Sequence, residues 1–152
     1  MTSLPAAPDV QLRPVVLLLA TPNTYRSQSF SVAAKKLGID IFWGLDMPAA
    51  LCSGWPNVLA LELRDPVAAA ASIVDLAQQR GLCAVLALDD AASLTAADAC
   101  ARLGLEHNAP AAAFAARDKL VMRQRLRAAG MSKPHKISIP RLLAAMENDC
   151  DR

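Results

Sequence analysis

Four short runs of consecutive apolar residues alternate with longer amphipathic stretches along most of this chain. Continuous apolar runs of this length are typical of strands that are buried on both faces, and the stretches between them have helical periodicity. The predicted strands are 15–20, 39–43, 57–63 and 83–88, and the predicted helices are 25–37, 66–80, 91–103 and 110–129. Such alternation predicts an α/β fold, a small doubly wound parallel sheet flanked by helices.

Glycine follows each of the four predicted helices. These glycines are Gly38, Gly81, Gly104 and Gly130, and an apolar residue comes directly after every one of them. A glycine in this place closes a helix in the left-handed conformation, and the apolar residue then returns the chain toward the core. Asp65-Pro66 is the matching start signal, because aspartate is a favoured N-cap and proline fits the first helical position.

The length of 152 residues fits one domain of ordinary size. We expect an N-terminal tail over residues 1–14, one domain over 15–131, and a linker with a short C-terminal helix over 132–152. The apolar side of that last helix, around 139–147, predicts a homodimer. The alternatives are a tail folded back onto its own domain and a frayed terminus.

The charge balance excludes some classes of partner. Sixteen basic and fourteen acidic residues give a formal charge of +2, too balanced for a protein that coats nucleic acid or an anionic membrane. The longest strongly apolar run, Val15 to Ala20, is far too short to cross a bilayer. Prolines and the lack of early basic residues also argue against a signal peptide at the start.

The cysteines do not form a metal-binding pattern. They are Cys52, Cys83, Cys100 and Cys150, with no CxxC pair among them. Because the only histidines are His107 and His135, we expect no zinc site, and idle or buried thiols instead. Unpaired thiols of this kind suit a reducing, cytoplasmic location.

Two polar loops are predicted to meet at one edge of the sheet. In a doubly wound sheet the strand order reverses, which places a crevice outside the carboxyl ends of the first and fourth strands. The segment 21–26 follows the first strand and Asp89-Asp90 follows the fourth. Arg26, Asp89 and Asp90 are therefore candidate substrate-crevice residues, and the alternative is that they only cap their loops.

The first of these loops lacks the glycines of a nucleotide-binding loop. A dinucleotide fold places GxGxxG after its first strand, because glycines let the backbone approach the phosphates. The first glycine of this chain is Gly38, well beyond that loop, and no Walker motif occurs anywhere. The sheet is thus expected to be Rossmann-like without binding a nucleotide in the Rossmann manner.

A basic helix is predicted near the end of the domain. Lys119, Arg123 and Arg127 are spaced four apart, so on a helix they form one ridge. The ridge is open to three interpretations: a solvated face of an amphipathic helix, a group that reaches a phosphate on a small molecule, or a nucleic-acid surface. The balanced overall charge disfavours the third.

Several segments together resemble the N-terminal part of ATP-grasp ligases, a superfamily that includes biotin carboxylase and carbamoyl-phosphate synthase. In that superfamily a Rossmann-like pre-ATP-grasp domain ends in a helical segment with an Asp-Lys pair near its start and a glycine, then a proline, after it. Here the resemblance covers residues 15–134. It is carried by Asp89-Asp90, 96–105, 107–110, Asp118-Lys119, and Gly130 with Pro134.

The resemblance implies that Lys119 contacts an ATP phosphate from outside the grasp fold. A lysine suits this role because its ammonium is a compact point charge. The resemblance also implies that Arg26, Asp89 and Asp90 face the second substrate, a small carboxylate. ATP and magnesium are the cofactors that it implies for the complete enzyme, which would be a carboxylate–amine or related ligase.

The chain departs from the family pattern after Pro134. There the family continues with a second phosphate-binding lysine, a glycine-rich loop and metal ligands, whereas residues 135–152 offer no backbone loop to cradle triphosphate and no carboxylates to hold magnesium in the family manner. We therefore expect the isolated chain to be catalytically incomplete, with the ATP-grasp domains as its missing partners. The alternative is a stand-alone α/β module that binds a small ligand or regulates another protein.

Overall fold

The computed structural model of the protein describes residues 13–131. Residues 1–12 of the expected tail and the segment 132–152 lie outside the described residues. The dimer expected from that segment therefore stays a prediction. The chain divides into one compact unit that ends at Phe114 and a second that begins at Ala115. Each unit is described by itself, and the expected single domain over 15–131 stays a prediction.

Four parallel strands form one sheet in the order β3-β2-β1-β4. The strands are β1 (Val15–Ala20), β2 (Asp40–Asp46), β3 (Val58–Leu61) and β4 (Leu82–Ala87). All four coincide with predicted strands, although β2 runs three residues further than the predicted end at 43 and β3 is shorter at both ends. The reversal of strand order between β1 and β4 is the one that a doubly wound sheet requires.

The helices follow the predicted alternation with two differences. They are α1 (Ser27–Leu37), α2 (Ala49–Cys52), α3 (Pro66–Arg80), the 3-10 turn η1 (Asp90–Ala92), α4 (Ser93–Leu103), α5 (Pro110–Arg117) and α6 (Lys119–Ala128). The short α2 was not predicted, because four residues are too few to show helical periodicity. The predicted helix over 110–129 is two helices, because Asp118 between them has an extended backbone.

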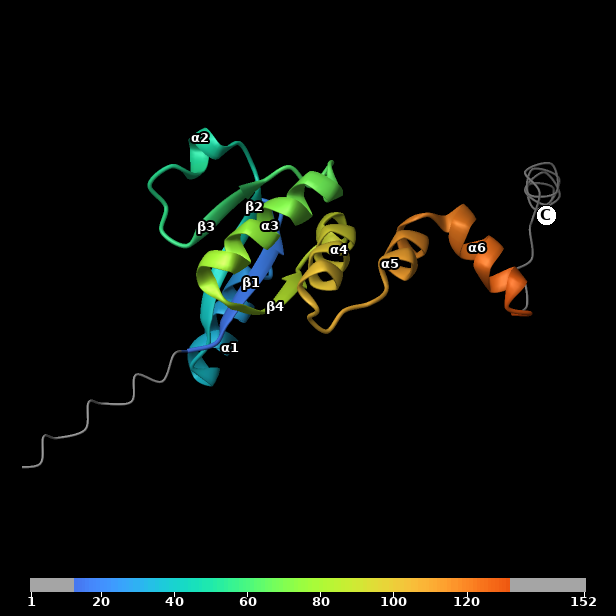
Figure 1. The fold of residues 1–152 in the computed structure, drawn as a ribbon, viewed down its shortest axis with the longest axis horizontal. Coiled ribbons are helices and arrows are strands. Elements are labelled where there is room, and N and C mark those ends of the chain that lie inside the picture. The colour runs from blue at the N-terminus through green and yellow to red at the C-terminus, as the bar shows by residue number, and fades with distance from the viewer. Residues whose placement is uncertain (1–12, 132–152) are drawn as a thin grey trace, which may run out of the picture. The chain divides into compact units, whose positions relative to one another are not determined.

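Helices α3 and α4 lie side by side against the sheet (Figure 1). Alternate side chains of the sheet pack into two separate apolar clusters. Leu17 and Leu19 of β1 face the larger cluster, to which α3 and α4 also contribute. Leu18 and Ala20 face the smaller cluster, where Phe30 of α1 packs against them. The α/β, Rossmann-like prediction is thus confirmed, with helices on both faces of a parallel sheet.

The predicted helix ends are confirmed at the glycines. Gly38, Gly81 and Gly104 all have positive φ, and each N–H donates to the carbonyl four residues earlier. Leu82 and Leu105, the apolar residues after two of them, pack against the larger cluster. No helix among residues 13–131 has both the length and the apolar character needed to cross a membrane.

Gly44 fills a different role, in the middle of β2. A Cβ atom built on this residue would lie 2.5 Å from Leu19 Cδ2 and 2.8 Å from Leu61 Cδ1. Both leucines are buried, so neither has free space into which to move. The absence of a side chain at position 44 therefore lets leucines of β1 and β3 meet across β2.

We predict that Gly44→Ala lowers the free energy of unfolding by about 1–3 kcal/mol, because overpacking a closed core displaces well-packed side chains. Gly44 is not among the glycines with positive φ, so the cost comes from space and not from backbone conformation. Urea denaturation measures the change. Ala71→Gly on the exposed side of α3 is a control that should cost about 1 kcal/mol through helix propensity alone. A fully stable Gly44→Ala protein would contradict this packing.

Candidate functional site

The loops that follow β1 and β4 are joined by one carboxylate. The backbone N–H and the hydroxyl of Thr21 both donate to Asp89 Oδ2, each at 2.9 Å. The hydroxyl of Thr24 donates to Asp89 Oδ1 at 3.2 Å. Because β1 and β4 are neighbours in the sheet, the two loops meet as the sequence predicted.

Arg26 forms a second link between the same two segments. Its Nη1 donates to the carbonyl of Leu88, directly after β4, at 2.9 Å, while its Nε donates to the hydroxyl of Tyr25 at 3.3 Å. The guanidinium also lies 5.4 Å from the centre of the Tyr25 ring. Asp90 is exposed and begins η1. The contacts of Arg26 and Asp89 thus hold together the loops that follow β1 and β4.

The ionisation of Asp89 reflects these bonds. Burial, the largest single influence, opposes its charged form. The hydrogen bonds from Thr21 and Thr24 and the positive charge of Arg26 act in the opposite direction and outweigh burial, so that the pKa of Asp89 lies below its ordinary value.

A depression of about 320 Å³ lies beside the junction of the loops that follow β1 and β4, on the face of the sheet that carries α1. We call it the aromatic pocket. Its lining residues are Ala20, Thr21, Pro22, Thr24, Ser27, Trp43, Leu45, Met47, Trp55 and Val58. The chain contains only two tryptophans, and both are in this lining.

The position of the aromatic pocket follows from how the sheet is covered. Trp43 and Val58 are paired neighbours on β2 and β3, and Leu18 of β1 is the partner of Trp43 on the other side. These side chains share the face that α1 covers, whereas α3 and α4 pack together on the opposite face. A single helix does not cover the whole width of this face, so the side chains of β2 and β3 are left to line a depression.

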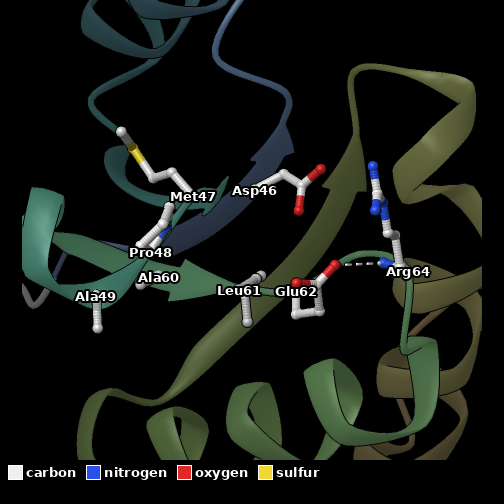
Figure 2. A pocket seen from close by; sticks show the side chains of 8 residues that line it. All are labelled: Asp46, Met47, Pro48, Ala49, Ala60, Leu61, Glu62 and Arg64. Carbon is white, nitrogen blue, oxygen red and sulfur yellow. Dashed lines mark hydrogen bonds between the residues drawn. The ribbon is translucent and has the colours of Figure 1, made fainter.

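A second depression, of about 530 Å³, lies at the ends of β2 and β3 (Figure 2). We call it the charged pocket. In Figure 2 the side chains of Asp46, Glu62 and Arg64 lie toward one end, and Met47 and Pro48 lie toward the other. Asp46 Oδ1 accepts a hydrogen bond from the backbone N–H of Leu63 at 3.0 Å, which fixes that carboxylate.

The predicted crevice residues do not line either pocket. Arg26, Asp89 and Asp90 are absent from the linings of both the aromatic pocket and the charged pocket. Sequence reasoning identified the loop 21–26 but missed Trp43 and Trp55. The signal available for these two was their rarity, since an aromatic-poor chain places one tryptophan at the end of a predicted strand and the other just before the next one.

Lys119 is the first residue of α6, in the second unit, and its side chain is exposed. Asp118 is the N-cap, and its Oδ1 accepts from the N–H groups of Leu120 at 2.8 Å and Val121 at 3.1 Å. The carboxylate therefore occupies the place where a helix N-terminus binds a phosphate. The phosphate contact that the resemblance implies for Lys119 would therefore use the charge of its side chain and not the N-terminus of α6.

The described residues contain no cluster of metal-binding side chains. Between Arg13 and Met131, no three His, Cys, Asp or Glu side chains lie close enough to hold a metal ion. Of the cysteines in that range, Cys52 and Cys100 are buried and Cys83 is exposed. Burial raises the pKa of the Cys100 thiol, whose Sγ lies 3.6 Å from the carbonyl oxygen of Val85.

Comparison with known proteins adds a structural neighbour. No family model and no curated protein sequence matches the chain. Among solved structures, an L-amino acid ligase from Bacillus licheniformis superposes with a TM-score of 0.64 at 18% sequence identity, over 80% of this chain. The chain spans about a third of that ligase, 32% of its length. At this identity the likeness shows a common fold.

We predict that Asp89→Ala lowers the free energy of unfolding by about 1–2 kcal/mol, because three hydrogen-bond donors lose their shared acceptor at a partly solvated site. Asp90→Ala is the matched control, because Asp90 is the next residue and its exposed carboxylate accepts none of these hydrogen bonds. Chemical denaturation of both variants measures the difference. Equal stability of the two variants would mean that the Asp89 bonds contribute nothing.

The lowered pKa of Asp89 predicts a pH dependence. The charged carboxylate favours the folded state above its unfolded pKa of about 3.9, and this stabilisation is lost as the pH falls through the lower folded pKa. The stability difference between the natural protein and Asp89→Asn should therefore be largest near neutral pH and shrink below about pH 4. Urea titrations at pH 7, 4 and 3 test this, and a difference that grows in acid would contradict it.

Proposed function

We propose that this chain is the N-terminal, pre-ATP-grasp domain of an ATP-dependent carboxylate–amine ligase. The observation that carries the proposal is Lys119 at the first position of a helix that follows the Rossmann-like sheet in the sequence, where the resemblance requires it. The structural neighbour supports it, because an L-amino acid ligase joins a carboxylate to an amine. The chain contributes a substrate crevice and one phosphate contact.

The chemistry of such a ligase proceeds in two steps. A carboxylate oxygen of the substrate attacks the γ-phosphorus of ATP, the bond to the bridging oxygen breaks, and ADP leaves. The amine nitrogen then attacks the acyl carbon, phosphate departs with its bonding electrons, and the nitrogen loses a proton. Lys119 neutralises phosphate charge during the first step. The remaining ATP contacts and the magnesium ligands belong to the grasp domains.

A second candidate is a stand-alone module that binds a small ligand. The aromatic pocket favours it, because all residues that line this pocket belong to the first unit. Such a module would bind its ligand without ATP and without another protein. A homodimer formed through the segment 132–152 is compatible with either function, and light scattering on the full chain tests for it.

We predict that the isolated chain neither hydrolyses ATP nor forms a ligation product, and that it binds ATP more weakly than a dissociation constant of about 1 μM, which corresponds to about −8 kcal/mol. A single lysine supplies too few of the contacts that a triphosphate site needs for tighter binding. Calorimetry measures the affinity for ATP, and phosphate release measures ATP hydrolysis. Arg123→Ala is the control for Lys119→Ala on the same helix. Phosphate release that Lys119→Ala abolishes, or micromolar binding, would contradict the proposal.

The direct test supplies the missing domains. Sequencing the gene beyond codon 152 is the first step, and where it encodes ATP-grasp domains these are produced together with the present chain. ADP should then form only when a carboxylate and an amine are both present, and Lys119→Ala should lower its rate at least tenfold while Arg123→Ala leaves it unchanged. If full ADP formation persists with Lys119→Ala, the phosphate role of Lys119 is wrong.

A further inference from the structure

We infer that the aromatic pocket binds an α-amino acid with an aromatic or bulky apolar side chain. The inference deepens the proposed function, on which its role as a substrate site rests, by naming the substrate class. It depends on three features of the pocket: an apolar end lined by tryptophan, a pair of hydroxyl oxygens that can only accept, and a donor at the start of α1.

The apolar end selects the side chain of the ligand. Trp43, Leu45 and Val58 line it from β2 and β3, and Trp55 lines it from the segment after α2. Trp55 is 54% exposed, so a large aromatic surface is available to a ligand before any rearrangement. Flat aromatic groups stack on indole rings, and aliphatic groups gain from removing the same surface from water.

The size of the depression suits a small ligand. Its volume of about 320 Å³ lies at the lower end of the roughly 300–1,000 Å³ that is usual for small-molecule sites. Glycine or alanine would leave the end lined by tryptophan empty.

The polar end selects an ammonium group. Thr21 and Thr24 line the pocket, and their hydroxyl hydrogens are already donated to Asp89. Each hydroxyl oxygen keeps lone pairs, so toward a ligand these groups can only accept. The ionised carboxylate of Asp89 lies one hydrogen bond behind them and favours a positive charge at this place.

A donor for the carboxylate lies beside these acceptors. Ser27 lines the pocket and is the first residue of α1. The hydroxyl group of Ser27 can donate a hydrogen bond to a ligand carboxylate. Acceptors on Thr21 and Thr24 beside a donor at Ser27 match the ammonium and carboxylate of one α-amino acid.

Intrinsic fluorescence tests the inference, because both tryptophans of the chain line the pocket. L-phenylalanine is the probe, added to the full chain without ATP, and calorimetry measures the same titration independently. We expect a saturable fluorescence change with a dissociation constant of about 1 mM or tighter. L-alanine, phenethylamine and 3-phenylpropanoate, which lack the ring, the carboxylate and the ammonium respectively, should each bind at least tenfold more weakly.

Three variants locate the site. Trp55→Ala should weaken L-phenylalanine binding at least fivefold, with Trp43 left as the reporter. Leu51→Ala is the matched control, an equally exposed apolar residue of α2 outside the lining, and should bind normally. Ser27→Ala should weaken L-phenylalanine binding but leave phenethylamine unaffected, because only the carboxylate needs this donor.

The outcomes separate this inference from the proposed function. Absence of saturable binding by L-phenylalanine, or equal effects of Trp55→Ala and Leu51→Ala, would overturn the site. Equal binding of L-phenylalanine, phenethylamine and 3-phenylpropanoate would overturn the amino-acid assignment. If L-phenylalanine binds as expected but no ADP forms with the grasp domains, the ligase proposal is wrong and the binding site stands. If other acids are ligated but L-phenylalanine does not bind, only this inference is wrong.

Discussion

The candidate site depends on one carboxylate. Asp89, just beyond β4, accepts three hydrogen bonds from the loop that follows β1. These bonds fix Thr21 and Thr24, and with them the entry into α1 and the polar side of the aromatic pocket. Arg26 strengthens the same junction through the Leu88 carbonyl. A residue outside the pocket lining can thus fix the shape of the pocket, because it holds the hydroxyl groups of two residues that line it.

Local rules predicted most of the framework. Apolar runs located all four strands, glycines marked the helix ends, and Asp65-Pro66 marked the start of α3, where Asp65 accepts from the Ala68 N–H. These signals depend on residues close together in sequence. The meeting of the first and fourth loops also followed from topology alone. Arg26, Asp89 and Asp90 were placed at the correct edge, and their role toward a ligand stays a prediction.

The aromatic pocket and the helix break could not be predicted in the same way. The pocket exists because Trp43, Val58 and Trp55 come together on a face that α1 covers incompletely, and this depends on the width of the sheet. The break at Asp118 occurs inside a continuous helical pattern. There the carboxylate captures two backbone N–H groups, and that local capture competes with helix continuation.

The sheet ends in β4, which pairs only with β1 among the described strands. Its sequence, Leu82–Ala87, contains no charged residue and no proline, which are the usual protections of an edge strand. The outer backbone groups of β4 can therefore accept another extended segment as a fifth strand. In a larger polypeptide this edge allows the sheet to grow, whereas for isolated chains in concentrated solution it is a template for joining one molecule to the next.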